Sequence, residues 1–533
     1  MVSEAVTDFV DVLDSGSNPK TWWSRTLAAE AMPGVLTPLG WSVFGWSGEM
    51  SMRRGYAALG ILPADEVRMP EKSEDRIINI FRGRATARVD FFLQMGDRIP
   101  VTSGAKVARQ ILGFVPDGYA GRREWRYLPK LLRAMPKSFR SAPRLTAQAR
   151  AETQQWYPAA IAGVDGLDLA SARSRFADAV NRFAECMAIQ GIAFLCGVQP
   201  IYDQLTAVTA KVADLPDVEL VGSCGSHEEL GLVADLWALS RERIDLATFL
   251  DRHGYHGPRE GEIAATVWRD DPEPLRAIVA GYRALPDERD PAIAESLKER
   301  RRAEAERELI ARLRPHQRPA ARWVIRQAHT YLPLRGVAKV SFLQSLAVAR
   351  AAARRIGGLL VTDGALDHPD DVFMLTRQEV LAESGPRIGD LVEFRRERYE
   401  HYQTIDLPMF WQGDPEPTVG ATASAAGSNG VSGIGVSPGI REGRLRVVLD
   451  PADSEMAEGE ILVARTTDPS WASVMFLAGA LVVDIGGPLS HAAVVAREMG
   501  IPCVMGTENG TARLRTGDRA RVDGSLGTVE VLP

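Results

Sequence analysis

The sequence predicts a multidomain protein, with a mainly α-helical region at residues 1–410, a flexible linker at 411–433 and a small α/β module at 434–533. Three observations predict this division. A chain of 533 residues is too long for one hydrophobic core and suggests two to four domains. Apolar residues recur at helical spacing in the first region, whereas short β-type runs fill the last hundred residues. The stretch between them is rich in Gly, Ser, Ala, Pro and Thr, which is typical of a linker with a span of roughly 25 Å.

Helical periodicity is clearest in "SARSRFADAVNRFAECMAIQGIAFL" (171–195) and "KVSFLQSLAVARAAARRIGG" (339–358). The segment 297–314 is highly charged and predicts a solvated helix. The segment 122–144 is basic with interleaved aromatic residues. It predicts a pair of surface helices, or a surface that docks a phosphorylated ligand or a partner.

The last region contains β-type runs with Gly, Asp and Pro between them: "GRLRVVL", "EILVAR", "ALVVDIG", "RARVDG" and "GTVEVL". Only "SHAAVVAREMG" and "PSWASVMFLAG" have the pattern of helices. These features predict a compact α/β module.

The bulk composition excludes several classes of protein. A net charge of −6 does not call for nucleic acid or an anionic membrane as a partner. The four cysteines form no CxxC pair, so we expect neither structural zinc nor disulfides. The longest apolar run, "WASVMFLAGALVV", is shorter than the roughly 20 residues that span a bilayer, and the start of the chain lacks a signal pattern. We expect a cytoplasmic protein.

One of the eight histidines lies where a strand-like run meets a helix-like run, in "GGPLSHAAVVAREMG" (486–500). Gly486 and Gly487 permit backbone geometry that other residues resist. Ser490 can cap the following helix, which places His491 in its first turn. The unpaired N–H groups of that turn favour phosphate and keep an imidazole neutral. We therefore expect a nucleophilic His491 in a phosphate cradle of Gly486, Gly487 and Ser490; the alternative is a histidine that only caps a helix.

Four segments of the last region occur in one fixed order: "GIGVSPGIREGRLRVV" (433–448), "TTDPSW" (466–471), "GGPLSHAAVVAREMGIPCV" (486–504) and "GDRARVDGSLGTVEV" (517–531). Together they resemble the swivelling phosphohistidine domain of the PEP-utilizing enzymes, such as phosphoenolpyruvate synthases and pyruvate phosphate dikinases. This resemblance implies that His491 is transiently phosphorylated. Leu489 stands where plant-type dikinases carry a regulatory threonine, so that control is not expected.

Those enzymes usually carry an ATP-grasp domain before the swivelling domain and a pyruvate-binding barrel after it. We recognise neither in this chain, and no GxxxxGK[ST] phosphate loop is present. We therefore do not expect this chain to make or use phosphoenolpyruvate by itself.

Four earlier segments resemble the acceptor domain of rifampin phosphotransferases and phenylphosphate synthases. They are "AAEAMPGVLTPLGWSVF" (28–44), "FLDRHGYHGPREGEIAATVWRDDP" (249–272), "LPLRGVAKVSFLQ" (332–344) and "GALDHPDDVFMLTRQEV" (364–380). The resemblance implies that the helical region binds a small-molecule substrate. Two departures stand out: the family's GHRG reads "GYHG" here, without its arginine, and Gly336 and Ala338 differ from the family's REYPK.

Arg335 and Lys339 match the two cations of that REYPK segment and lie at i and i+4, on one helix face. Phosphoryl transfer needs fixed positive charge at the phosphoryl oxygens. A clamp on the phosphoryl group is therefore expected from these two residues; the alternative is a pair of solvated helix cations.

Further substrate-binding candidates are Glu30, Trp41, His253, His256 and Glu260. Trp41, with its neighbours Trp22, Trp23 and Trp46, is expected either to wall an apolar acceptor pocket or to pack in an ordinary core. The acceptor hydroxyl needs a general base, and the candidates are Glu30, His253, His256 and Glu260. The alternative for the two histidines is a hydrogen-bonded turn.

These expectations describe the histidine-bearing subunit of a split phosphotransferase. A separate ATP-grasp partner would charge His491 with the β-phosphoryl group of ATP, with Mg²⁺ held mostly on that partner. The module would then carry the phosphoryl group to a small organic hydroxyl. A dehydratase that eliminates the phosphate, a non-catalytic phosphocarrier and a degenerate substrate-binding homologue remain open alternatives, and the sequence does not identify the acceptor.

Overall fold

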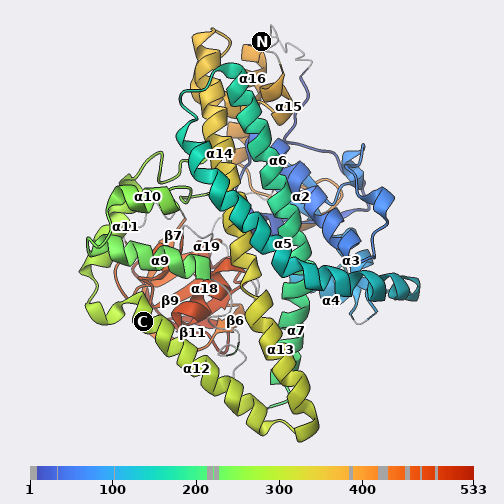
Figure 1. Cartoon of the computed structure of the whole chain (residues 1–533), viewed down its shortest axis with the longest axis vertical. Coiled ribbons are helices and arrows are strands. Elements are labelled where there is room, and N and C mark those ends of the chain that lie inside the picture. Colours follow the sequence, from blue (N-terminus) through green and yellow to red (C-terminus); the bar gives the residue numbers. More distant parts are fainter. Residues whose placement is uncertain are drawn as a thin grey trace.

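The computed structural model divides into a large helical body and a C-terminal α/β module (Figure 1). It describes residues 9–532 except 33, 101, 213–219, 221–226, 383–387, 418–429, 450–455, 468–470 and 487–489.

The helical body is built around α14 (Leu334–Thr362), which is buried along most of its length. α5 (Leu128–Ala162) and α6 (Leu169–Ala193) pack against α14, and α2 (Pro38–Ala58) packs against α6. Small buried residues of α14, such as Ala349 and Ala352, allow this close approach. The other helices of the body are α1 (Thr26–Ala31), α3 (Val89–Asp97), α4 (Gly104–Leu112), α7 (Gln199–Thr209), α13 (Arg318–Tyr331), α15 (Arg377–Leu381) and α16 (Ile388–Gln403).

The two segments with the clearest helical periodicity form α6 and α14, so that prediction is confirmed. α6 continues through a π-helical turn into α7, which gives an unbroken helical run at Leu169–Thr209. By length and composition alone this run could cross a membrane. Half of its most apolar window is buried inside the protein, however, as in a core helix.

The body also contains a small antiparallel sheet that the sequence analysis did not predict. Its strand order is β2-β3-β1-β4, with β1 at Trp22–Ser24, β2 at Ile78–Phe81, β3 at Arg84–Arg88 and β4 at Phe410–Gln412. The strands are three to five residues long, too short for an alternating pattern to stand out. β1 pairs with β4 through Trp23 and Trp411, so the sheet joins the two ends of the region expected to be mainly helical.

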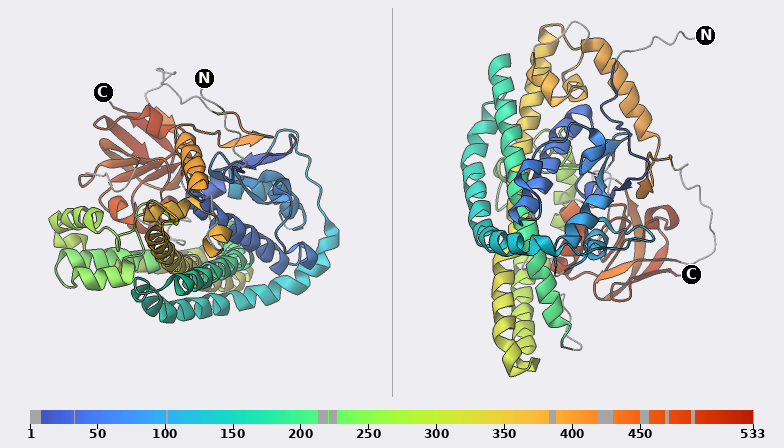
Figure 2. Two further views of the ribbon diagram at one scale, coloured as in Figure 1. Left: turned by 90° about the horizontal axis from the view of Figure 1, so that it is seen from above. Right: turned by 90° about the vertical axis from the view of Figure 1, so that its right-hand side faces the viewer.

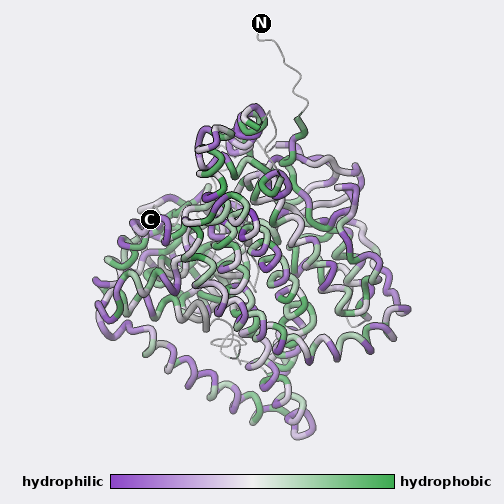
Figure 3. Tube along the Cα trace, turned by 45° about the horizontal axis from the view of Figure 1, so that its top comes forward, coloured by the Kyte–Doolittle hydropathy of each residue, from purple (hydrophilic) through white to green (hydrophobic). Residues whose placement is uncertain are grey.

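A helical arm projects from the body. It comprises α9 (His227–Ser240), α10 (Leu246–His253), α11 (Glu273–Ala284) and α12 (Pro291–Arg312). α12 contains most of the charged segment at 297–314 and runs along the lower edge of Figure 3, where most of its residues are coloured as hydrophilic. The prediction of a solvated helix is confirmed, with Ala305 and Leu309 buried in the core cluster that α12 shares with α13.

The C-terminal module is an eight-stranded sheet with the order β5-β12-β11-β7-β8-β9-β10-β6, in which β7 to β10 are parallel. The five predicted β-type runs form β7 (Ile440–Val448), β8 (Ile461–Ala464), β9 (Ala480–Val483), β11 (Arg519–Asp523) and β12 (Thr528–Val531). β5 (Gly430–Ser432), β6 (Ile434–Ser437) and β10 (Cys503–Met505) complete the sheet. The helices of the module are α17 (Ala472–Met475), α18 (His491–Met499) and α19 (Gly510–Arg513).

The two ends of the range expected to be a linker, 411–433, form strands. β4 pairs with the body and β5 pairs with β12 of the module. Residues 418–429, in the middle of that range, lie outside the described part of the structure. The connection between the two sheets is therefore shorter than the composition suggested.

The module lies against the helical arm, as both views of Figure 2 show. One hydrophobic cluster contains residues of α9 and α11 together with residues of α17 and α18. The Phe476 ring stacks on the Tyr282 ring with centroids 5.1 Å apart. In a second contact of the module, Arg465 forms a 2.7 Å ion pair with Asp406, just after α16. The structure therefore shows a docked arrangement of module and body.

Candidate functional site

The GGPLSH segment joins β9 to α18. Ser490 has extended backbone geometry, and its hydroxyl accepts a hydrogen bond from the N–H of Ala493, as an N-cap does. His491 is therefore the first residue of α18, and the helix ends at Gly500 in the left-handed conformation. The predicted cap geometry is confirmed. Gly487 and the side chain of His491 lie outside the described part of the structure.

Gly486 occupies a position that other residues cannot take without strain. Its φ angle is +142°. A Cβ atom there would lie 2.4 Å from Cε of Met505 and 3.1 Å from the Ser490 side chain. The Ser490 hydroxyl also lies 3.0 Å from the Met505 sulfur. This glycine, the first residue of the predicted phosphate cradle, thus lets the backbone pass close to β10.

Asp484, at the end of β9, organises the same region. Its buried carboxylate accepts hydrogen bonds from the Thr507 hydroxyl at 2.7 Å, from the Gly510 N–H at 2.5 Å, and from the N–H and hydroxyl of Thr511. These bonds tie β9 to the start of α19. Asp484 was not among the predicted site residues. Its position directly after an apolar strand, and two residues before a pair of glycines, is the signal that could have identified it.

A second group of predicted residues meets in the body. Nδ1 of His256 lies 2.6 Å from Oε2 of Glu260, and both side chains are almost fully buried. Nζ of Lys339, on α14, lies 3.7 Å from Oε1 of Glu260. The structure therefore brings together three residues that the sequence analysis selected from two separate segments.

This geometry prepares His256 to accept a proton. When Nδ1–H donates to the carboxylate, Nε2 keeps its lone pair. No described residue forms a hydrogen bond with Nε2 of His256. Burial raises the pKa of Glu260, but His256, Lys339 and Arg350 lower it more, so the net pKa is below its ordinary value. Glu260 is therefore an ionised partner that orients the imidazole.

Buried contacts fix the loop that carries this pair. The Arg350 guanidinium, on α14, is 2% exposed and donates to the carbonyls of Glu260, Glu262 and Ile263 at 2.9–3.1 Å. Arg259 has a left-handed φ of +55° and donates to the Val35 carbonyl at 3.0 Å. The loop is thus held both to α14 and to the segment that precedes α2.

Glu262 connects the loop to the start of α2. The hydroxyl of Thr37, the N-cap of α2, donates to Oε1 of Glu262 at 2.7 Å. A Cβ on Gly40 would lie 2.4 Å from the same oxygen, so only glycine leaves room for the carboxylate. Burial raises the pKa of Glu262, although Arg259 and Thr37 oppose the rise, and its Oε2 is buried without a hydrogen-bond partner. Three of the four family-like segments therefore converge around this loop.

The other predicted residues lie in different surroundings. His253 pairs with Asp235 of α9 at 2.8 Å, and burial lowers the pKa of His253. Arg335 lies on α14 one turn before Lys339 and is partly exposed, so the two cations share one helix as expected. The side chain of Glu30 lies outside the described part of the structure.

The four tryptophans near the N-terminus do not form one wall. Trp23 packs with Phe81 and Trp411, whereas Trp41 belongs to a separate core cluster. Trp22 lies against Phe114, and Trp46 lies under the Arg377 guanidinium. Trp41 is 7% exposed and fills the space above Gly45. Its observed surroundings are those of a core residue.

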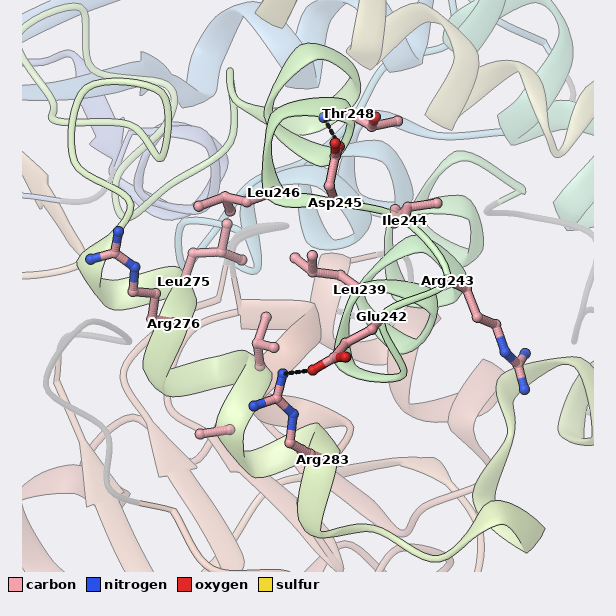
Figure 4. Close-up of a pocket in the computed structure, with 12 residues that line it drawn as sticks. Leu239, Glu242, Arg243, Ile244, Asp245, Leu246, Thr248, Leu275, Arg276 and Arg283 are labelled. Atoms are coloured by element: carbon pink, nitrogen blue, oxygen red, sulfur yellow. Dashed lines mark hydrogen bonds and ion pairs between the residues drawn. The ribbon is translucent and has the colours of Figure 1, made fainter.

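A cavity of about 750 Å³ lies between α9, α10 and α11 (Figure 4). Apolar residues such as Leu239, Leu246 and Leu275 line it together with charged residues, which include the Arg283–Glu242 ion pair. Thr248, at the start of α10, lines the cavity, while His253 ends that helix. None of the predicted site residues lines this cavity, so we do not assign it to the acceptor.

The module and the arm match known protein families. Residues 456–527 match the family described as PEP-utilising enzyme, mobile domain, and residues 205–336 match the rifampicin phosphotransferase fourth domain. Both matches confirm the resemblance that the sequence motifs indicated. The first contains the GGPLSH segment, and the second contains the loop of His256 and Glu260.

Curated relatives add a second comparison. An uncharacterized protein of Mycobacterium tuberculosis (strain ATCC 25618 / H37Rv) is 34% identical over 280 residues, which cover 52% of this chain and 30% of that protein. A rifampicin phosphotransferase of Streptomyces sp is 36% identical, covering 60% of this chain and 39% of the relative. The rifampicin phosphotransferase of Bacillus subtilis (strain 168) is 27% identical, covering 55% and 35%. The chain thus spans 30% to 39% of the length of these relatives.

Proposed function

We propose that this chain is the phosphohistidine-carrying part of a phosphotransferase, and that it delivers a phosphoryl group to a hydroxyl of a small organic molecule. The observation that carries the proposal is the His256–Glu260–Lys339 group, in which one carboxylate contacts both an imidazole and a cation. The similarity to rifampicin phosphotransferases supports the same reaction class.

In the proposed reaction the acceptor hydroxyl oxygen attacks the phosphorus atom carried by His491. A new O–P bond forms and the N–P bond to His491 breaks. The hydroxyl proton moves to Nε2 of His256, and the His491 ring takes up a proton from water as it leaves. The hydroxide formed from that water then takes the proton from His256. Arg335 and Lys339 neutralise charge on the phosphoryl oxygens during transfer.

Charging of His491 belongs to a separate ATP-grasp partner in this proposal, which uses ATP and releases AMP and phosphate. Mg²⁺ would act at the nucleotide. Among the described residues, no three His, Cys, Asp or Glu side chains come together in a group that could hold a metal ion. We place the protein in the cytoplasm, where ATP is available.

A chemical donor can test the transfer step without the partner. Phosphoramidate phosphorylates reactive histidines, so the full chain is charged with it and followed by intact mass and ³¹P NMR. We expect one phosphoryl group on the wild-type chain and none on His491→Ala. Addition of a hydroxyl compound should then convert the phosphohistidine signal into a phosphate ester. Rifampicin is the first compound to test, because two relatives carry its name.

Each outcome decides a different part of the proposal. Charging of His491→Ala to the wild-type level would show that His491 is not the carrier. An unchanged rate of ester formation in His256→Gln would show that His256 takes no part in the transfer step. Release of free phosphate together with a dehydrated product would show that elimination follows transfer. A charged chain that donates to none of a broad set of hydroxyl compounds, but only to a protein, would establish the phosphocarrier alternative instead.

A further inference from the structure

α5 contains a seven-residue repeat over residues 129–149. "PKLLRAM" (129–135) is followed by "PKSFRSA" (136–142) and "PRLTAQA" (143–149), so proline and then a cation recur every seven residues. Two helical turns return nearly to the same face of a helix, with a drift of only about 20° per heptad. The repeated residues therefore lie in rows along α5. This helix runs along an outer edge of the body (Figure 2).

One row is basic. Lys130, Arg133, Lys137, Arg140 and Arg144 are all exposed, and their spacing of three and four residues places them within an arc of about 80° over about 21 Å of helix. No acidic residue occurs between Glu124 and Glu152. In the part of the chain that the structure describes, these five side chains form no ion pair, and Lys130 lies over the Tyr127 ring. The row is a concentrated positive surface on a chain whose net charge is −6.

A second row, next to the basic one, is apolar and exposed. It consists of Trp125 at 58% exposure, Pro129, Leu132 at 63% exposure and Pro136, again at spacings of four and three. The third face of the helix is buried in the body through residues such as Leu131 and Ala142. α5 and the 3₁₀ turn that precedes it (Trp125–Tyr127) therefore hold both rows at the surface, on a helix that packs against the body.

We propose that residues 125–144 form a docking surface for an acidic amphipathic helix of a partner protein. The exposed apolar row has the four-and-three spacing that packs against the apolar stripe of a second helix. Acidic residues that flank such a stripe would face the basic row. Tryptophan and arginine are also the side chains that contribute most to protein interfaces. This inference goes beyond the proposed function and does not depend on it.

Two other polyanionic surfaces fit the observations less well. An interfacial membrane helix presents a wide apolar face to lipid, whereas Trp125 and Leu132 are the only large apolar side chains that are exposed among the described residues 122–162. A long nucleic acid would also meet the remaining surface, where the acids outnumber the bases. A protein helix meets only the local surface, because salt screens charges beyond about 8 Å.

The test uses the full chain and a defined probe. The probe is a fluorescent three-heptad peptide with leucine at its a and d positions and glutamate on the flanking positions, compared with a scrambled peptide of the same composition. Anisotropy is measured at physiological ionic strength. We expect the scrambled peptide to bind at least roughly tenfold more weakly.

Two variants and one control locate the binding. Lys130→Glu/Arg133→Glu/Lys137→Glu removes the basic row, and Trp125→Ala/Leu132→Ala removes the apolar row. Each should weaken peptide binding by roughly tenfold or more. The control, Arg300→Glu/Arg301→Glu/Arg307→Glu, reverses three exposed charges on α12 and should bind like the wild type. Thermal unfolding followed by circular dichroism confirms that each variant is folded before binding is compared.

Four results would overturn the proposal. They are equal binding of the scrambled peptide, full binding by either α5 variant, an equal loss in the α12 control, and no binding of the amphipathic peptide to the wild type. Vesicles of phosphatidylcholine and phosphatidylserine, and a short DNA duplex, are measured in parallel. Tighter binding to either of these than to the amphipathic peptide would also overturn it and would identify a membrane or a nucleic acid as the ligand.

Discussion

His256 and Glu260 form a buried imidazole–carboxylate pair, with Nδ1 2.6 Å from Oε2. A carboxylate in this position fixes which ring nitrogen carries the proton, as the buried aspartate does in serine protease triads. Lys339 lies 3.7 Å from the other oxygen of Glu260. The carboxylate therefore connects the proposed base to α14, where the proposed phosphoryl clamp lies.

Glu260→Gln tests this connection. The neutral amide cannot stabilise the imidazolium that forms when His256 takes the hydroxyl proton. Transfer from the phosphorylated chain to an acceptor should therefore slow by roughly 100-fold or more. Charging of His491 by phosphoramidate should not change. Glu49→Gln is the matched control, because Glu49 is equally buried but binds Arg53 and the backbone of β2. A wild-type transfer rate in Glu260→Gln would disprove the role of Glu260 in orienting His256.

The parts of this site that depend on local signals were predictable from the sequence. Ser490 and Gly500 could be predicted as helix caps because capping depends only on residues next to the helix ends. The five strands of the module could be predicted because apolar residues recur locally and Gly, Asp or Pro residues bound each run. His256, Glu260 and Lys339 were selected because their segments resemble known ones. Their contact, across almost 80 residues, came only from the structure.

The parts that depend on distant contacts were not predictable. Glu262 and Thr37 are 225 residues apart in the chain, and neither has a local pattern that points to the other. The same holds for Trp23 and Trp411, whose pairing closes the unpredicted sheet. The tryptophan cluster of the sequence, in contrast, suggested a common pocket that the fold divides between different cores.

Arg350→Met should destabilise the loop that carries the proposed base. Three buried carbonyls, those of Glu260, Glu262 and Ile263, would each lose a charged donor. Because unsatisfied buried polar groups are costly, we expect the free energy of unfolding to fall by about 2–4 kcal/mol. Urea denaturation measures this change. Arg301→Met, on the exposed surface of α12, is the control and should change the free energy of unfolding by less than about 0.5 kcal/mol. A similarly small effect of Arg350→Met would show that the loop does not depend on the guanidinium.

His253→Gln should reduce the loss of stability in mild acid. Burial lowers the pKa of His253 below 6.5, and the hydrogen bond to Asp235 opposes this only in part. As the pH falls below 6.5, the unfolded chain binds a proton at this position before the folded chain does, so the wild-type protein loses stability by up to about 1.4 kcal/mol per pH unit. The glutamine variant lacks this contribution and should show a flatter dependence of melting temperature on pH between roughly 6.5 and 5.

The exposed His401→Gln variant is the comparison for that measurement. It should follow the wild-type pH dependence. The lowered pKa values of Glu260 and Asp235 also make stability fall in acid. That loss occurs below the ordinary pKa values of these carboxyls, 4.5 and 3.8, and therefore outside the pH range used for His253. Parallel curves for the wild type and His253→Gln would show that burial of His253 does not shift its proton affinity.

Phe476 and Leu477 should control the docking of the module on the arm. Phe476 stacks on Tyr282, and a Cβ on Gly281 would lie 3.3 Å from Leu477, so the two side chains cover α11 closely. Replacing both with alanine removes apolar burial that contributes about 2–4 kcal/mol to docking. The module should then spend more time undocked, with a larger radius of gyration in solution scattering and faster amide exchange in α11.

Leu526→Ala, at a side chain that is 76% exposed on the same module, should leave both measurements unchanged. If the double variant behaves like Leu526→Ala, the docked arrangement is held by other contacts, of which the Arg465–Asp406 ion pair would be the next to remove.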